Sequence, residues 1–395
     1  MSQFGNQLME KISMFQKLPV PSSKLFVWAF IPYRLTEKGW ESKDYDTPAT
    51  RQELADVFAE LGIKWKWQPI TFENMHEVVE EVAAFSKEYI PMVLNFCAGD
   101  EDPNYPGTCV IKLLEAKGIL FTGADSTFDY LCSSKLRMKR AFVEEDVATA
   151  PYEVIADPSH VQGVCERLGT PLIVKPAISF ASRGISLQSV VESDEQVSLQ
   201  LQRLLQGQHD MQFPPDSIFV ERFINGREFT VFLLGSSQQP ESIKIYPPAE
   251  RVFHSNLPKT QRFLAYDWYW TKYEEGSLFS PEEPFCRYGL VGSDLHDKLC
   301  ELSKLAYCAV GGNGYARVDI RMDTASQELF VLEVNPNCGI SSYPLSTFDD
   351  NDLGATSVGT ILHLAGIPFP QLMSEMIAEA FARQSTQLQL ANKSA

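Results

Sequence analysis

Apolar residues in the first third of the chain form short continuous runs that alternate with segments of helical period. The runs have the length of buried parallel strands, and the segments between them place apolar residues three or four positions apart. The predicted strands span residues 25–31, 64–70, 91–97 and 119–122, and the predicted helices span residues 47–61, 73–88 and 108–117. This alternation predicts a doubly wound α/β unit over residues 23–122.

The pattern changes after Gly123, where strands and helices no longer alternate strictly. Helices are predicted at 133–145, 158–168, 193–205, 293–310, 358–365 and 371–383, and strands at 172–176, 185–190, 217–223, 228–234, 242–246, 316–322 and 328–334. Residues 262–290 show little periodicity and are rich in Tyr, Trp and Glu. Since connections of that length are uncommon and often functional, this segment is predicted to be a lid.

The predicted elements divide the chain into five parts. They are an N-terminal extension (1–22), an α/β domain (23–132), a central subdomain (133–222), a C-terminal subdomain (223–370) and a final helix with its tail (371–395). In open α/β sheets, ligands usually bind beyond the carboxyl ends of the strands. The loop at 98–107 follows such a strand end and is therefore expected to border a ligand.

The charge balance argues against a nucleic-acid partner. Among 395 residues, 34 Lys and Arg stand against 51 Asp and Glu, a net charge of −17, and the basic residues are scattered. The eight cysteines form no C-x-x-C pair, which is typical of reduced thiols in a cytoplasmic protein. No apolar run reaches the roughly 18–20 residues that cross a bilayer. We therefore expect no membrane partner.

Polar side chains share one face of each of two predicted strands near residue 325. Arg317 and Asp319 alternate on the first strand, and Glu333 and Asn335 alternate on the second. If the strands pair, Asp319, Glu333 and Asn335 converge as hard oxygen ligands, a set that suits Mg²⁺ or Mn²⁺ carrying a nucleotide's phosphates. A solvated sheet face would also alternate polar residues, but it gives no reason for the Asn-Pro-Asn-x-Gly turn that follows. The common glycine-rich phosphate loops are absent, so a nucleotide would be held by another design.

Four ordered motifs resemble those of the ATP-grasp superfamily and, within it, the D-alanine–D-alanine ligase family. They are Leu-Ile-Val-Lys-Pro at 172–176, Phe-Val-Glu-Arg-Phe-Ile-Asn-Gly-Arg-Glu-Phe-Thr at 219–230, Tyr-Asp-Trp-Tyr-Trp-Thr-Lys-Tyr at 266–273, and Ala-Arg-Val-Asp at 316–319 with Leu-Glu-Val-Asn-Pro at 332–336. The resemblance covers residues 123–365 approximately. It implies an α/β ATP-grasp fold preceded by a pre-ATP-grasp domain, ATP and Mg²⁺ as cofactors, and a homodimer.

The resemblance also implies a role for each matching residue. The phosphate ligands would be Lys135, Lys175, Ser182 and Lys272, the adenine ligands Glu221, Phe223 and Ile224, the ribose ligand Glu228, the metal ligands Asp319, Glu333 and Asn335, and the catalytic residues Arg317, Gly339 and Lys272. Lys135 alone could be an ordinary surface lysine, and Glu228 a solvated charge on an exposed strand. Lys175 ends an apolar strand, which solvation explains poorly.

The implied reaction joins a carboxylate to an amine through an acylphosphate at the expense of ATP. The positions that bind amino acids in the family depart from its pattern, because residues 30–37 and 95–103 lack its Glu-containing and His-Gly motifs. Pro344 and Ala181 stand where substrate-binding serines are expected. We therefore predict a ligase for amino-acid-like substrates other than two D-alanines.

Two alternatives remain: a D-alanine–D-alanine ligase with divergent loops, and a non-catalytic ATP-binding regulatory protein. The candidates for an altered pocket are loop or strand-end residues: Tyr33, Arg34, Asp100, Ser341, Ser342 and Tyr343.

Overall fold

The N-terminal unit is a sheet whose central strand, β1 (Leu25–Thr36), is buried on both faces. The computed structural model describes residues 18–37, 39–42, 45–85, 87–99, 104–155, 157–179, 182–209, 211–270, 284–345 and 355–394. β1 lies parallel to β3 (Lys64–Ile70) and β4 (Ile90–Asn95), and β4 lies parallel to β5 (Leu120–Phe121). The connecting helices are α2 (Pro48–Leu61), α3 (Met75–Ala83) and α4 (Thr108–Ala116). The predicted doubly wound unit is confirmed.

The period-two pattern of β1 explains why helices cover both faces of this sheet. Val27 and Ala29 pack in the cluster that contains α2, whereas Trp28 and Phe30 pack in the cluster that contains α3 and α4. The strand also continues five residues beyond its predicted end. Residues 33–36 pair with β2 (Gly39–Ser42) as an antiparallel hairpin, and this pairing satisfies backbone groups that the broken apolar pattern left unassigned.

The central unit is a four-stranded antiparallel sheet in the order β6 (Tyr152–Val154), β9 (Ile218–Arg222), β7 (Leu172–Pro176) and β8 (Val190–Val191). α7 (Val164–Leu168) and α8 (Asp194–Gln206) belong to its hydrophobic cluster. The predicted strand at 185–190 is wrong over most of its length, because Leu187–Ser189 forms a 3₁₀ turn. The Ser186 amide donates to Ser189 Oγ (2.9 Å), and this local hydrogen bond competes with the sheet.

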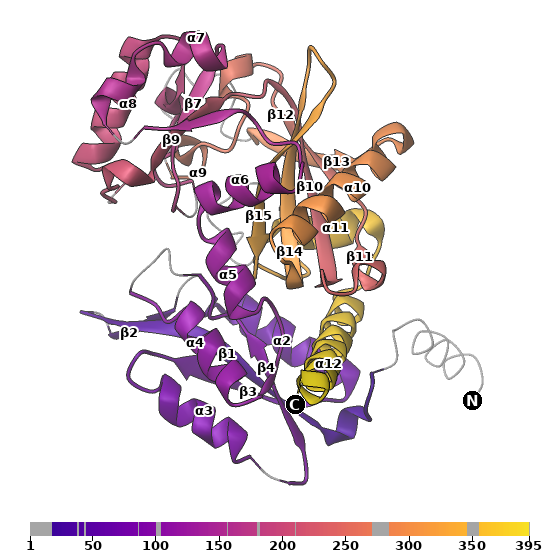
Figure 1. Cartoon of the computed structure of the whole chain (residues 1–395). Helices are drawn as coiled ribbons and strands as arrows, with labels where there is room; N and C mark the ends of the chain where they lie inside the picture. The colour runs from indigo at the N-terminus through magenta and orange to yellow at the C-terminus, as the bar shows by residue number, and fades with distance from the viewer. Residues whose placement is uncertain are drawn as a thin grey trace.

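The C-terminal unit is a six-stranded antiparallel sheet. Its order is β13 (Cys286–Leu290), β12 (Ala249–Phe253), β10 (Gly226–Ser236), β14 (Asn313–Asp323) and β15 (Leu329–Pro336), with β11 (Lys244–Ile245) paired to β10. One face is covered by α5 (Ser126–Cys132), α6 (Lys135–Glu144) and α10 (Ser293–Ala309), whose apolar residues share a cluster with β10, β14 and β15. α6 thus packs on the C-terminal sheet and stands beside the central sheet (Figure 1).

The last two helices join the C-terminal sheet to the N-terminal unit. α11 (Ser357–Ala365) and α12 (Phe369–Ser394) share one hydrophobic cluster with β1, α2, and the second face of the C-terminal sheet (Figure 1). Arg383 on α12 donates to the carbonyl oxygens of Gly123 (2.8 Å) and Phe121 (2.7 Å). Among the helices that the structure describes, none has the length and apolarity needed to cross a membrane.

Candidate active site

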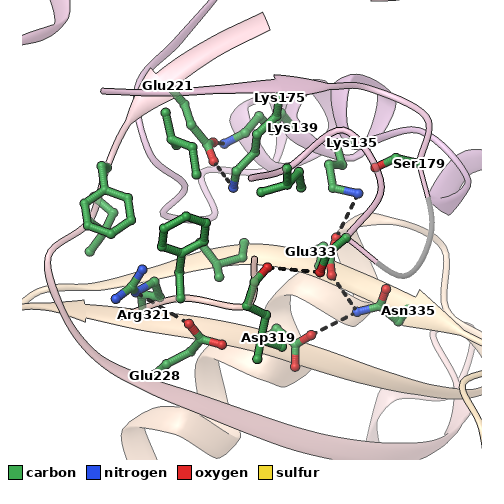
Figure 2. A pocket seen from close by; sticks show the side chains of 18 of the residues that line it. Lys135, Lys139, Lys175, Ser179, Glu221, Glu228, Asp319, Arg321, Glu333 and Asn335 are labelled. Carbon is green, nitrogen blue, oxygen red and sulfur yellow. Dashed lines mark hydrogen bonds and ion pairs between the residues drawn. The ribbon is translucent and has the colours of Figure 1, made fainter. Parts of the chain in front are cut away.

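A cavity of about 500 Å³ lies between the central sheet and the C-terminal sheet. Residues of α6, β7 and β9 form one wall, and residues of β10, β14 and β15 form the other (Figure 2). Most of the polar residues singled out from the sequence line it. They are Lys135, Lys175, Ser182, Glu221, Glu228, Arg317, Asp319, Glu333 and Asn335, together with Phe223 and Ile224. Two sheets that are separate in the sequence thus place these side chains around one space.

The predicted hairpin of β14 and β15 is present and brings the three predicted oxygen ligands together. Asp319 pairs with Glu333 and Arg317 pairs with Asn335 in the antiparallel register. The Asn335 amide nitrogen donates to Asp319 Oδ2 (3.2 Å) and to Glu333 Oε1 (3.3 Å). The register shifts directly after Asp319, and irregularities of this kind re-aim side chains beside active sites. The arrangement presents two carboxylates and one amide to the cavity.

Arg317 is held by Asp319 in a two-point contact. Its Nε and Nη2 lie 3.1 and 2.9 Å from the two carboxylate oxygens of Asp319. Both residues stand on the same face of β14, two positions apart, so the backbone itself sets the pairing. Asp319 thereby fixes the orientation of the guanidinium, which can stabilise negative charge that develops beside it.

Glu333 is ionised at neutral pH despite its burial. Burial alone would raise the pKa of its carboxyl, but the charges of Lys135, Arg317 and Lys175 lower it to about 2. Lys135 Nζ lies 3.2 Å from Glu333 Oε2. An ionised carboxylate is a hard oxygen ligand of the kind that Mg²⁺ prefers. Lys135 is therefore a cavity residue and not an ordinary surface lysine.

Glu221 is buried and carries an ammonium group on each oxygen. Lys175 Nζ lies 2.6 Å from Oε1, and Lys139 Nζ lies 2.5 Å from Oε2 (Figure 2). Lys139 also donates to Thr149 Oγ1 (2.8 Å) and to the Ala150 carbonyl (3.2 Å). Burial would raise the pKa of Glu221, but the two lysines lower it overall. The structure thus pairs Glu221 with both lysines.

Lys139 was not predicted from the sequence. It is 1% exposed, and burial lowers the pKa of its ammonium group, with Glu221 opposing that shift. A signal was present, because Lys139 follows Lys135 by four positions on α6 and lies next to Met138 in the buried stripe that continues to Phe142. A lysine inside the apolar stripe of a helix needs a buried partner.

Glu228 is the centre of a row of charges across three strands. In register it faces Arg251 on β12 and Arg321 on β14. Arg251 Nη1 forms an ion pair with Glu228 Oε1, and Arg321 Nε lies 3.7 Å from Oε2. All three residues are at most 3% exposed. The alternative of a solvated charge on an exposed strand is therefore wrong for Glu228. Arg251 was missed because its strand was not predicted, and Arg321 was given no role.

One end of the cavity is apolar. Phe223, Ile224, Ile185, Phe263 and Leu264 line it. The rings of Phe223 and Phe263 meet edge to face at 5.7 Å, and the Arg321 guanidinium lies 4.8 Å from the centre of the Phe223 ring. A flat, weakly polar ring system fits between such side chains. This end suits a heterocycle, and the lysine-rich end suits phosphates.

Among the other predicted residues, Ser182 lines the cavity, Gly339 does not, and two lie outside the described residues. Ser182 has a positive φ of 58° and donates to the Leu264 carbonyl (3.0 Å). Gly339 is not among the described residues that line the cavity, so its contact with a reacting carbonyl stays a prediction. Lys272 and Asp100 lie outside the described residues, as do residues 271–283 of the predicted lid (262–290).

The candidates for an altered substrate pocket are engaged with neighbours in the N-terminal unit and the loop after β15. Tyr33 donates to Asp46, and Arg34 Nη2 lies 3.1 Å from Glu41 Oε2. The Ser342 amide donates to Glu53 Oε1 at 2.5 Å.

Within the described residues, no group of three His, Cys, Asp or Glu side chains is placed to bind a metal. The candidate cation site instead combines two carboxylates with the Asn335 amide.

Comparisons with known proteins agree with this geometry. A family model described as "D-ala D-ala ligase C-terminus" matches residues 144–378. A D-alanine–D-alanine ligase of Acinetobacter baumannii (strain AYE) is 27% identical over 297 residues, 74% of this chain and 82% of that protein. One of Acinetobacter baylyi is 26% identical over 332 residues, 83% and 89% of the two chains.

Solved structures resemble this chain over most of its length. The D-alanine–D-alanine ligase of Bacillus anthracis, which has also been solved in complex with ATP, superposes with a TM-score of 0.58 at 17% identity over 92% of this chain and 99% of its own. The enzyme of Coxiella burnetii gives 0.58 at 16% identity over 93% and 98%. At such identities the likeness establishes a shared fold.

Proposed function

Because this chain belongs to the D-alanine–D-alanine ligase family and is therefore an ATP-dependent enzyme that forms carbon–nitrogen bonds, we propose that it joins an amino-acid-like carboxylate to an amine. We propose further that its two substrates are not both D-alanine. The observation that carries the reaction type is the convergence of Asp319, Glu333 and Asn335 opposite two lysines. The departures at residues 30–37 and 95–103 support different substrates.

The residues of the cavity fit a nucleotide with a divalent cation. The candidate metal ligands at its polar end are oxygen atoms, and the Glu333 carboxylate among them is ionised. Mg²⁺ prefers such ligands. Lys135 and Lys175 would hold phosphate oxygens, and the apolar end beside Phe223 would receive adenine. When bound, the cation supplies charge neutralisation and orientation of the phosphates.

The proposed reaction has two chemical steps. In the first, a carboxylate oxygen of the substrate attacks the γ-phosphorus of ATP, a new P–O bond forms and the bond to the departing ADP breaks. Lys135 and Lys175 would offset the charge on the phosphates. In the second step the amine nitrogen attacks the acylphosphate carbon, and phosphate leaves with the C–O electron pair. The amine proton passes to solvent or to the departing phosphate.

Arg317 is proposed to stabilise the oxyanion of the second step. Its guanidinium is already fixed by Asp319, so little reorganisation is needed when charge develops. Glu221 would accept from the adenine amino group with Lys139 and Lys175 as its counter-charges. Glu228 would bind ribose while Arg251 and Arg321 hold its carboxylate in place. Exclusion of water by residues 262–290 would protect the acylphosphate.

A second candidate function is a true D-alanine–D-alanine ligase, which the names of the relatives favour. The two candidates differ in the substrate that releases ADP. ADP and phosphate release should be measured with Mg²⁺, ATP and a panel of single amino acids and pairs. Release that requires a pair or an amino acid other than D-alanine supports the proposal. Release with D-alanine alone supports the second candidate.

The acylphosphate step has its own readout. Added hydroxylamine should trap the intermediate as a hydroxamate of the carboxylate substrate. Absence of substrate-dependent ADP under every pairing would overturn both candidate functions. ADP release without any hydroxamate or amide product would overturn the acylphosphate mechanism.

A further inference from the structure

A second cavity, of about 180 Å³, lies between α12 and the C-terminal sheet. One wall is a single face of α12, formed by Glu375, Ala378, Glu379, Ala382 and Arg383. The other walls come from the end of β10, the turn after it, β11 and the start of β14. The two cavities share no lining residue. This space is therefore separate from the candidate active site.

Glu379 brings to this cavity two carboxylate oxygens that receive no hydrogen bond from the described residues. The Glu379 side chain is 9% exposed, and neither of its oxygens accepts a hydrogen bond from the described residues. Its nearest cation is Arg383 Nε at 3.4 Å, and the other Arg383 nitrogens are committed to the carbonyls of Gly123 and Phe121. Buried carboxylates normally gain hydrogen bonds as well as a counter-charge.

Asn313 adds a third unpaired acceptor. It is 4% exposed, and its amide nitrogen donates to Asp125 Oδ2 at 2.6 Å. That bond assigns the orientation of the amide and leaves Oδ1, which has no hydrogen-bond partner among the described residues, as an acceptor. Asn313 and Glu379 both line the cavity.

Glu375, one turn earlier on α12, shows what a satisfied carboxylate looks like in this fold. It forms an ion pair with Lys244 and accepts from the Tyr246 hydroxyl, and Gln371 donates to it at 2.9 Å. The fold thus satisfies Glu375 fully and leaves Glu379 without hydrogen bonds from the residues described. Glu379 therefore has acceptor capacity that this part of the chain does not use.

The local charge is negative. The carboxylates of Glu375, Glu379 and Asp125 face two cations, Lys244 and Arg383, and the phenols of Tyr246 and Tyr307 are the other titratable groups packed there. Burial raises the pKa of Glu379 to about 7, Asp125 adds to that rise and Arg383 opposes it. A bound cation would hold Glu379 in its ionised form.

We propose that this cavity binds the ammonium group of a small primary amine, which donates to Glu379 and to Asn313 Oδ1. Three acceptors without hydrogen bonds from the described residues, two of them the oxygens of one carboxylate, match the three N–H donors of an ammonium group. Gln238 and Ser242 at the rim are exposed, so the space is reachable from solvent. The amine could be a simple amine or the amino group of an amino acid, and both present the same ammonium chemistry.

Calorimetric titration of the full chain at pH 8 tests the proposal. n-Propylammonium or glycine should bind saturably with one site per chain, and binding should persist when a non-hydrolysable ATP analogue saturates the active site. Glu379→Gln should weaken binding at least tenfold. Glu241→Gln, an exposed carboxylate on the adjoining turn, is the matched control and should bind like the parent. Lowering the pH from 8 to 6 should weaken binding about tenfold, because Glu379 becomes protonated.

A second variant tests the same cavity in case Glu379→Gln does not fold. Ala382→Met places a larger side chain at an exposed position of the cavity wall and leaves the Glu379 carboxylate in the chain, and it should also abolish binding. Equal melting temperatures of parent and variants confirm that the fold is intact.

Binding by n-propylammonium alone identifies a simple amine, and binding by glycine alone identifies an amino acid. No saturable binding to the parent chain, or unchanged binding to Glu379→Gln, overturns the proposal. Equal binding of K⁺ or tetramethylammonium, which have no N–H donors, also overturns it and indicates an adventitious ion only. Since these measurements do not involve turnover, their failure leaves the proposed ligase reaction unaffected.

Discussion

Asn337 donates a hydrogen bond to Asp129 at 3.2 Å across 208 positions of sequence. Asp129 on α5 is 2% exposed and also accepts from the Thr108 hydroxyl (2.5 Å) and the Gly99 amide. The side-chain carbonyl of Asn337 in turn accepts from the Ala124 amide (2.8 Å). One carboxylate therefore connects the loop after β4 with the turn that ends β15, immediately beyond the candidate metal ligands.

Replacing Asp129 by Asn should loosen this connection. The new amide would present an N–H group to donors that now meet a carboxylate oxygen, so we expect a loss of about 1–3 kcal/mol in the free energy of unfolding. Denaturant titration measures it. Asp297→Asn, a carboxylate whose side chain is 99% exposed, should change stability by less than about 0.5 kcal/mol. Similar losses in both variants would contradict the role of Asp129.

Glu333→Gln should abolish turnover while the fold is retained. The substitution keeps the shape of the side chain but removes the charge that pairs with Lys135 and that would hold the cation. We expect a fall in kcat of at least about 100-fold, measured as substrate-dependent ADP release. Glu328→Gln, at an exposed position just before β15, is the matched control. Full activity of Glu333→Gln would refute the assignment of Glu333 to the metal site.

The low pKa of Glu333 also predicts how stability depends on pH. Its pKa falls from 4.5 to about 2 on folding, so its contribution of about 3 kcal/mol is complete above pH 4.5 and is lost as the pH falls toward 2. The difference in unfolding free energy between the parent and Glu333→Gln should therefore shrink over this range. Urea titrations at several pH values measure it. A difference that stays constant down to pH 2 would show that Lys135, Arg317 and Lys175 do not stabilise the ionised carboxylate.

Lys139→Met should destabilise the fold, because it leaves Glu221 buried with one lysine in place of two. Removing one partner of a buried ion pair costs about 3–5 kcal/mol. The double variant Lys139→Met/Glu221→Gln should recover part of that loss, since the uncompensated carboxylate is then gone. A double-mutant cycle by thermal or denaturant unfolding tests this coupling. Strictly additive effects would mean that the two residues do not interact energetically.

Local patterns predicted most of the elements and much of the site. The apolar run before Lys175 identified β7, and the period-two alternation through Arg317 and Asp319 identified β14 and the face that its polar residues share. These features depend only on neighbours along the chain. The hairpin with β15 followed because the two strands are separated by a short turn and carry matching polar positions.

Features that depend on partners distant in sequence were not predicted. Lys139 has a meaning only beside Glu221, and Arg251 only beside Glu228, because α6 and β12 reach the cavity through packing that no local pattern encodes. The hairpin that extends β1 is local, and it was missed for a different reason: its polar strand residues break the apolar pattern and pair only with one another.

The sequence by itself determined the family, the ATP-grasp fold and the residue types at the end of the cavity proposed to hold phosphates and a cation, since short motifs carry those. Only the tertiary structure decided which charges are paired and which are left without hydrogen bonds from the described residues, as Glu375 and Glu379 are on one helix. The physical reason is that the cost of burying a charge depends on every group around it, and those groups come from all parts of the chain.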